Sequence, residues 1–230
     1  MNFSDALMDN NCMYKPIDLY IRTFSPNYKM ERHKHDQVEI MYVKTGSFNV
    51  HIYDNKENET ILHIYESQFL VIDINIEHYI EITTNVKILN LELLIKSNPY
   101  QPDVFKLSPI LRRNENYTNF CKEMVGYGIF NADETFPDLL SLFIKAIQNG
   151  YNDNYDYTQS LLLALLLNIG NCYKNVKRNT YSYYTSMIIN HINADLSNDL
   201  SISKLEKKLN VSKSYIHRCF KKDTGVSITE

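Results

Sequence analysis

Apolar and polar residues alternate along short runs between residues 18 and 95. Seven runs are rich in β-branched and aromatic residues and are separated by turn residues: DLYIRTF, EIMYVK, SFNVHIYD, TILHIY, QFLVIDI, HYIEI and VKILNLELLI. In the third run, Phe48, Val50 and Ile52 alternate with more polar neighbours, which is the period of a strand with two unlike faces. Runs at this regular spacing predict an all-β sandwich or barrel over residues 15–98.

The pattern changes to helical spacing after a proline-containing stretch near residue 100. Helices are predicted over residues 117–125, 138–148 and 157–173. The polar stretch 168–181 contains Gly170 and several basic residues, and it predicts a linker. We therefore expect an α+β protein in which a helical segment, residues 99–175, separates the β domain from a third region.

The third region, residues 181–230, carries the spacing of short amphipathic helices. The apolar positions predict helices over 183–194, 200–209 and 213–222. Ser212 is placed to cap the last helix, Ile216 and Phe220 form its apolar face, and Gly225 is placed to end it. Two helices joined by a tight turn near Asn210, with cations on the second helix, predict a helix-turn-helix that places that helix in the major groove of DNA.

The string LSISKLEKKLNVSKSYIHRCFKKDTGVSITE resembles the first helix-turn-helix of AraC/XylS-type bacterial transcription regulators. The resemblance implies that base edges are contacted by Ser214, His217 and Arg218, and phosphates by Lys213, Lys221 and Lys222. Regulators of this type carry two such units joined by a long helix. Because the sequence ends at Glu230, where that helix would begin, we expect the first half only of the DNA-binding domain.

The string HKHDQVEIMYVKTG resembles the first cupin motif, with His33, His35, Glu39 and Gly46 at its characteristic positions. The later string QFLVIDINIEHYIEI resembles the second motif, with His78 in the place of its histidine. On a strand, His33, His35 and Glu39 share one parity and point the same way. Three imidazoles and one carboxylate suit Fe, Mn, Ni or Zn, so a metal site is one interpretation of the set.

The second motif departs from the cupin pattern. Glu66 and Ser67 occupy the region of its usual glycine, and Asp73 and Ile74 replace its usual prolines. AraC-like sensor domains often keep the histidines without a metal, so the resemblance favours His33, His35, Glu39 and His78 as an effector-binding set. We predict little bound metal in the purified chain, and the question of a metal stays open.

Two further features of the β domain concern side chains outside these motifs. His51 and His63 lie outside both motifs, and we expect them to be structural residues hydrogen-bonded within the fold. Asn90 and Glu92 share one face of a predicted strand, and that face either lines a cavity or faces water. The residue pattern does not decide between these alternatives.

Charge is distributed unevenly along the chain. Its 230 residues carry a net charge of −3, but residues 176–230 hold nine Lys or Arg against five Asp or Glu, a local +4 that leaves −7 elsewhere. A basic end on an acidic body fits a protein of which only that end approaches phosphate. The four cysteines are far apart and form no CxxC pair, which argues against a disulfide framework or a zinc module.

These observations predict a ligand-responsive, sequence-specific DNA-binding transcription regulator. We expect no catalytic residues, no cofactor, a cytoplasmic location and no membrane segment, since no secretory signal is visible and the longest apolar run, 161–167, is short. The expected partners are promoter DNA, a small effector such as a sugar or another metabolite, and a second copy paired through residues 138–173. A metal-dependent cupin enzyme and a dimerisation-only antagonist of full-length regulators are the alternatives.

Overall fold

The structure is a computed structural model that describes two compact units. The described residues are 1–100, 105–150, 155–178, 185, 188, 202, 205, 206, 211–224, 227 and 228. The first unit is Met1–Lys174 and the second is Asn175–Glu230. Each unit is described by itself.

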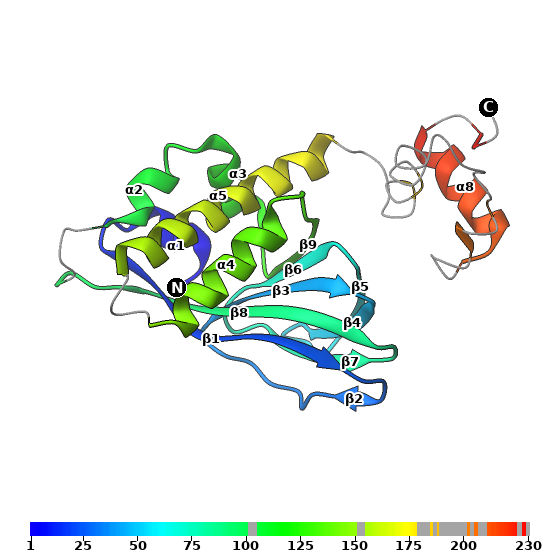
Figure 1. The fold of residues 1–230 in the computed structure, drawn as a ribbon, viewed down its shortest axis with the longest axis horizontal. Coiled ribbons are helices and arrows are strands. Elements are labelled where there is room, and N and C mark those ends of the chain that lie inside the picture. Colours follow the sequence, from blue (N-terminus) through cyan, green and yellow to red (C-terminus); the bar gives the residue numbers. More distant parts are fainter. Residues whose placement is uncertain are drawn as a thin grey trace. The chain divides into compact units, whose positions relative to one another are not determined.

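The first unit contains two antiparallel sheets (Figure 1). Their strands are β1 (Cys12–Phe24), β2 (Tyr28–Lys29), β3 (Val38–Thr45), β4 (Ser47–Tyr53), β5 (Glu59–Tyr65), β6 (Gln68–Ile72), β7 (Glu77–Ile82), β8 (Val86–Ser97) and β9 (Tyr127–Asn131). One sheet has the order β1-β8-β3-β6-β9 and the other β2-β7-β4-β5. All seven predicted strands are confirmed, whereas β2 and β9 are additional.

Helices cover one face of the five-stranded sheet, and the four-stranded sheet lies on its other side (Figure 1). These helices are α1 (Phe3–Met8), α2 (Leu107–Leu111), α3 (Glu115–Glu123), α4 (Phe136–Gln148) and α5 (Tyr155–Arg178). The three predicted helices correspond to α3, α4 and α5. The α+β class is confirmed, and the helical segment belongs to the same compact unit as the strands.

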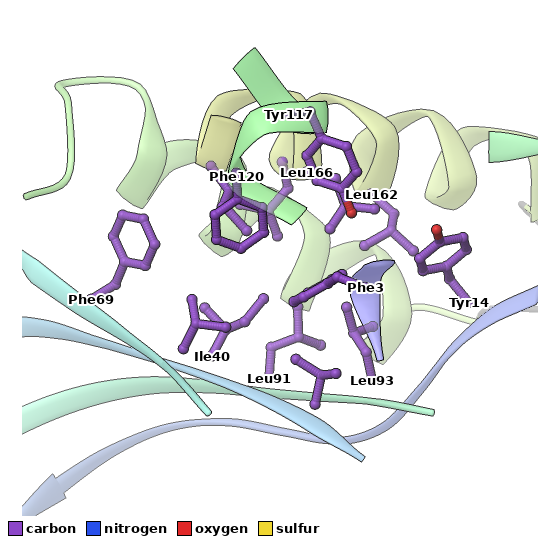
Figure 2. Close-up of a cluster of buried hydrophobic side chains, with 14 of the residues drawn as sticks. Phe3, Tyr14, Ile40, Phe69, Leu91, Leu93, Tyr117, Phe120, Leu162 and Leu166 are labelled. Carbon is purple, nitrogen blue, oxygen red and sulfur yellow. The ribbon is translucent and has the colours of Figure 1, made fainter. Parts of the chain in front are cut away.

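Side chains of the central strands point alternately to the two faces of the sheet and pack into two apolar cores. Ile88 on β8 lies in the core between the two sheets, whereas Leu89 and Leu91 lie in the core between the five-stranded sheet and the helices. Figure 2 shows this second core, where Leu91 and Phe120 approach from the strands and from α3. Because both faces of the five-stranded sheet are covered, its central strands are nearly all apolar.

The linker predicted over residues 168–181 is wrong for its first part, because α5 continues as a helix to Arg178. Gly170 lies inside this helix against α3, and a Cβ at Gly170 would lie 2.6 Å from the backbone N of Tyr117. The glycine therefore serves close helix packing rather than a chain break. Residues 179–181 lie outside the described part.

The apolar side chains of α4 and α5 that we assigned to subunit pairing pack within this unit. Phe143, Ala146 and Leu162 are buried, and the first and last of these lie in the core beneath the helices. Leu142 remains 45% exposed. Most of the apolar surface on which the predicted homodimer was based is thus buried against the sheet of the same chain. The dimer stays a prediction.

Gly46, between β3 and β4, has a φ of +82°, and a Cβ there would lie 2.2 Å from the backbone O of Asn85. Gly46→Ala is expected to lower the free energy of unfolding by about 3 kcal/mol, because left-handed strain and overpacking add. Gly126 also has a positive φ, but a Cβ at that position would meet only the flexible side chain of Ile76, whose Cδ1 would lie 3.6 Å away. Gly126→Ala is the matched control, with about 1 kcal/mol expected. Urea unfolding measures both, and equal losses would contradict the steric argument.

The second unit contains α8 (Lys213–Thr224), which begins where the sequence predicts. Ser212 Oγ accepts a hydrogen bond from the backbone N–H of Tyr215 at 3.3 Å, as an N-cap does. Ile216 and Phe220 are buried together with Ile188 and Leu205. The predicted helices 183–194 and 200–209 and the stop at Gly225 lie wholly or mostly outside the described residues. Among the described residues, no helix is long and apolar enough to cross a membrane.

Candidate functional site

The candidate site lies where the segment before β3 pairs with β7. His33 and His78 form an isolated antiparallel bridge, with N–H to O distances of 3.0 and 2.9 Å in the two directions. His35 follows in a loop, and its carbonyl accepts a hydrogen bond from the N–H of Asn75 at 2.7 Å. Glu39 lies on β3. A bend at residues 36 and 37 separates the two histidines from β3, so strand parity does not align them with Glu39. The bridge between His33 and β7 is what brings the three histidines and Glu39 together.

All three imidazoles are oriented by the same local hydrogen bond. In each, Nδ1 contacts the carbonyl oxygen of a residue two positions away: His33 to Glu31 at 2.9 Å, His35 to Gln37 at 3.0 Å and His78 to Ile76 at 2.9 Å. A carbonyl oxygen only accepts, so each Nδ1 carries the proton and donates it. In the neutral rings the lone pair is then on Nε2, the atom available to a ligand.

The ligand atoms of the three histidines converge beside a buried carboxylate. One ligand atom from each of His33, His35 and His78 lies within 4.8 Å of the others. Glu39 Oε2 lies 3.1 Å from His78 Nε2 and 3.6 Å from His35 Nε2. Ligands in adjacent positions around a metal, each at about 2.1 Å, lie roughly 3 Å apart, and the distance between Glu39 Oε2 and His78 Nε2 is close to this value.

The buried carboxylate is ionised. Burial opposes ionisation of Glu39, which is 4% exposed, but the imidazole of His35 at 3.6 Å and the hydrogen bond with His78 at 3.1 Å outweigh it and lower the pKa of Glu39 to about 2. The Glu39 carboxylate, 3.6 Å from His35 Nε2, also raises the pKa of His35 above its ordinary value, against the effect of burial. The site therefore combines imidazole nitrogens with a negative oxygen, a donor set suited to divalent transition metals.

The chemistry of this donor set requires a cation at its centre. With each Nδ1 already donating, an uncharged Nε2 and the Glu39 carboxylate are both acceptors, and His78 Nε2 lies only 3.1 Å from that carboxylate. Either a proton or a metal ion must lie between two such acceptors. A proton on the imidazole of His35 or His78 satisfies Glu39, in keeping with the lowered pKa of that carboxyl, and a divalent ion in its place would satisfy all four groups at once. The residues fit a metal, and the backbone carbonyls form the outer shell such histidines normally use.

The sequence argument against a metal assumed that the altered second motif positions His78 poorly. That reason is wrong, because His78 is 1% exposed and held by the bridge to His33. Ser67, in the region of the missing glycine, adopts the left-handed conformation with a φ of 65°, and Asn75 does so with a φ of 58°. The backbone path is thus kept without the usual glycine and prolines.

The two histidines outside the motifs are structural, as predicted. His51 Nδ1 lies 2.8 Å from Glu59 Oε1, and its ring stacks on Tyr79 with centroids 4.3 Å apart. His63 Nδ1 lies 2.7 Å from Asn49 Oδ1. Neither residue reaches the candidate site, since both lie on the outward parity of the four-stranded sheet.

Sequence reasoning missed part of the site's wall. Asn90 and Glu92 on β8 have the parity of Ile88, which lies in the core between the sheets, so they line the interior rather than face water. Their Cα partners on β1 are Tyr20 and Asp18. The alternation along β8 predicts that Asn90 and Glu92 share one face. It does not predict which residues lie opposite them, because the pairing of β1 with β8 is a long-range feature with no local sequence signal.

Five of the six predicted DNA-contacting residues have described side chains. Lys213, Ser214, Arg218 and Lys221 are exposed on α8, and His217 is half-buried. The guanidinium carbon of Arg218 lies 5.3 Å from the ring centroid of Tyr215, one turn earlier. The side chain of Lys222 lies outside the described part.

No family model matches the chain, and no curated protein matches it. Among solved structures, the chain matches oxalate decarboxylase of Bacillus subtilis at 17% identity and a TM-score of 0.29, over 46% of this chain and 26% of that one. It matches the cupin domain of Drosophila melanogaster CENP-C at 19% identity and a TM-score of 0.30, over 32% and 59%. The chain thus spans less than two thirds of either protein, and similarity this low carries no argument about function.

Proposed function

We propose that this protein is a ligand-responsive, DNA-binding transcription regulator in which the cupin-like first unit binds an effector and α8 of the second unit contacts DNA. The observation that carries the proposal is α8 itself. Its apolar face, Ile216 and Phe220, is buried, while Lys213, Arg218 and Lys221 are exposed. A capped helix with a buried face and a basic exposed face, within a sequence that resembles the AraC-type helix-turn-helix, is suited to the major groove.

The effector site of this proposal is built on a divalent transition metal held by His33, His35, His78 and Glu39. When bound, the metal would supply a Lewis acid that takes up oxygen or nitrogen atoms of the effector. The chain's own residues orient the site: the backbone carbonyls of Glu31, Gln37 and Ile76 hold the imidazole rings. Burial of Glu39 and His78 excludes water from its inner side.

Regulation requires the effector to bind two states of the protein with different affinity, because a ligand that binds both equally shifts nothing. The last turn of α5 ends at Arg178, at the start of the second unit. This continuous helix packs on the five-stranded sheet whose other face carries Glu39, and it is the element through which the interior of the first unit would influence the second.

The DNA-binding half of the proposal is tested with a DNA sequence enriched by the full chain from a random pool. Arg218→Ala is expected to lower affinity for the enriched sequence by about 1 to 3 kcal/mol while leaving binding to scrambled DNA nearly unchanged, because a guanidinium pairs bidentately with guanine. Lys221→Ala, the matched control, is expected to weaken both DNAs alike, since a phosphate contact carries no sequence information. Fluorescence anisotropy at fixed salt measures all four affinities, and equal losses for Arg218→Ala would contradict base contact.

The same centre favours a second candidate function, a metal-dependent cupin enzyme. The observation behind it is the set of three histidines and one carboxylate, in which His33 and His35 are only half-buried. Failure of the full chain to enrich any DNA sequence, together with stoichiometric metal, would favour the enzyme over the regulator.

A further inference from the structure

A buried amide without partners lies on the inner wall of the first unit. Asn90 on β8 is 1% exposed, and neither its Oδ1 nor its Nδ2 has a hydrogen-bond partner among the residues that the structure describes. Its Cα partners are Tyr20 on β1 and Met41 on β3, both of which contribute to the core between the sheets. Buried polar groups are nearly always hydrogen-bonded, so an amide that lacks both a donor and an acceptor partner indicates a group supplied from outside the chain.

A row of carboxylates lies two residues further along the same strands and runs from the buried Glu39 through the half-buried Glu92 to the exposed Asp18. Asp18 on β1 pairs with Glu92 on β8, and Glu92 pairs with Glu39 on β3. Like charges directly opposite on neighbouring strands are destabilising, so this register indicates a cation that lies against the row.

His35 and His78 lie at the Glu39 end of the row, but in the described part of the chain no side chain forms an ion pair with Glu92 or Asp18. Arg22, on the same parity of β1, lies over the ring of Phe24 with 5.0 Å between its guanidinium carbon and the centroid. Tyr20 lies half-buried beside the row, and burial together with the charges of Glu39, Asp18 and Glu92 raises the pKa of its hydroxyl. The hydroxyl stays protonated and is therefore a hydrogen-bond donor next to the carboxylates.

We propose that the effector of the first unit is a small molecule with a protonated amine next to a hydrogen-bond acceptor. The ammonium lies against Glu92 and Asp18, Asn90 Oδ1 accepts a hydrogen bond from the ligand, and Asn90 Nδ2 donates one to the ligand's acceptor. This assignment deepens the proposed function and rests on it, since it takes the interior of the first unit as the effector site. Because Glu92 lies opposite Glu39, the amine subsite adjoins the metal centre.

The unpaired amide of Asn90 and the row of carboxylates together favour this class of ligand over others. A carboxylate or phosphate without an amine could reach the metal but would leave Glu92 and Asp18 without a cation. A second metal ion would engage the carboxylates but leave Asn90 Nδ2, a donor, without an acceptor. An amine with a neighbouring hydroxyl or carboxylate satisfies the row and both amide atoms.

Isothermal titration calorimetry on the metal-loaded full chain tests the proposal. The probes are ethanolamine, glycine and 1,4-diaminobutane, against ethylene glycol and lactate as analogues without an amine. At least one amine that carries an acceptor is expected to bind ten times or more tightly than either amine-free analogue. Equal binding of the amine-free analogues, or no binding of any amine at millimolar concentration, would overturn the proposal. Binding of a second equivalent of metal that requires Glu92 would overturn it in favour of a two-metal wall.

Two variants localise the binding and separate it from folding. Glu92→Gln is expected to weaken the amine at least tenfold, while Glu66→Gln, which removes an exposed carboxylate from the turn between β5 and β6, leaves its affinity unchanged. Asn90→Leu is expected to lose amine binding and to raise the Tm of the ligand-free chain by about 3 °C, because it removes an unpaired buried amide. A lowered Tm with unchanged amine affinity would show that Asn90 is merely structural.

The outcome is distinguishable from failure of the proposed function. Amine binding is read by calorimetry without DNA, whereas the DNA-binding proposal is read by enrichment and by the Arg218 and Lys221 variants. A chain that binds amines through Glu92 but enriches no DNA keeps this inference and removes the regulator. A chain that enriches DNA but binds no amine does the reverse.

Discussion

Replacing His78 with alanine is expected to lower the affinity of the chain for a divalent transition metal by at least 100-fold, with loss of stoichiometric metal from the purified protein. His78 is the most deeply buried of the three histidines, and its Nε2 is the atom nearest to Glu39. The substitution removes a ligand and also the side chain that pairs with the carboxylate. Loss even of an outer-shell partner lowers affinity 10- to 100-fold, so loss of a ligand exceeds that range.

The matched control is His63→Ala, because His63 contacts Asn49 on the outward side of the other sheet. Elemental analysis after purification and competition with a chromophoric chelator measure stoichiometry and affinity. Wild type and His63→Ala are expected to retain one metal per chain. A wild-type chain that holds no metal after exposure to Zn²⁺, Mn²⁺, Fe²⁺ or Ni²⁺ would remove the metal centre from the account.

Replacing Glu39 with glutamine in the chelator-treated chain is expected to lower the free energy of unfolding by about 3 kcal/mol near pH 5.5. The folded pKa of Glu39 is about 2 against an ordinary value of 4.5, and each unit of difference corresponds to about 1.4 kcal/mol. The carboxylate is buried, accepts a hydrogen bond from His78 and lies 3.6 Å from His35 Nε2. Glutamine supplies no negative charge for these imidazoles.

The loss is expected to depend on pH in both directions. Because the folded pKa of Glu39 is lowered, its contribution is complete above 4.5 and is lost as the pH falls toward 2. Because the folded pKa of His35 is raised, its contribution is complete below 6.5 and is lost as the pH rises through the folded value. The difference between wild type and Glu39→Gln should therefore be largest between about pH 4.5 and 6.5. Urea midpoints across pH 3 to 8 measure it, and a difference independent of pH would contradict the ion pair.

Much of the fold follows from local patterns in the sequence. All seven predicted strands and three helices are present because their apolar periodicity reports burial against one sheet face. The missed elements are the strands β2 and β9 and the helices α1 and α2, all of them short. The two strands depend on pairing with β7 and β6, which no local pattern specifies. Gly170 was misinterpreted because a glycine that breaks a chain and one that lets two helices approach look alike in a sequence.

The candidate site was predicted in its membership but not in its construction. His33, His35, Glu39 and His78 do converge, yet the bridge between His33 and His78 and the three carbonyl contacts at Nδ1 exist only after the strands have paired. The inner wall of Asn90, Glu92, Tyr20 and Asp18 depends on the same long-range register. Residue spacing predicts which side chains share a face, whereas strand pairing decides what that face meets.

The central claim is that occupancy of the first unit controls DNA binding by α8. The most direct test is the affinity of the metal-loaded full chain for its enriched DNA sequence, measured by fluorescence anisotropy with and without a saturating amine that calorimetry has identified, and compared with His78→Ala. The account predicts a shift of five-fold or more on adding the amine, absent in His78→Ala. Identical affinities with and without the amine in the wild-type chain would contradict it.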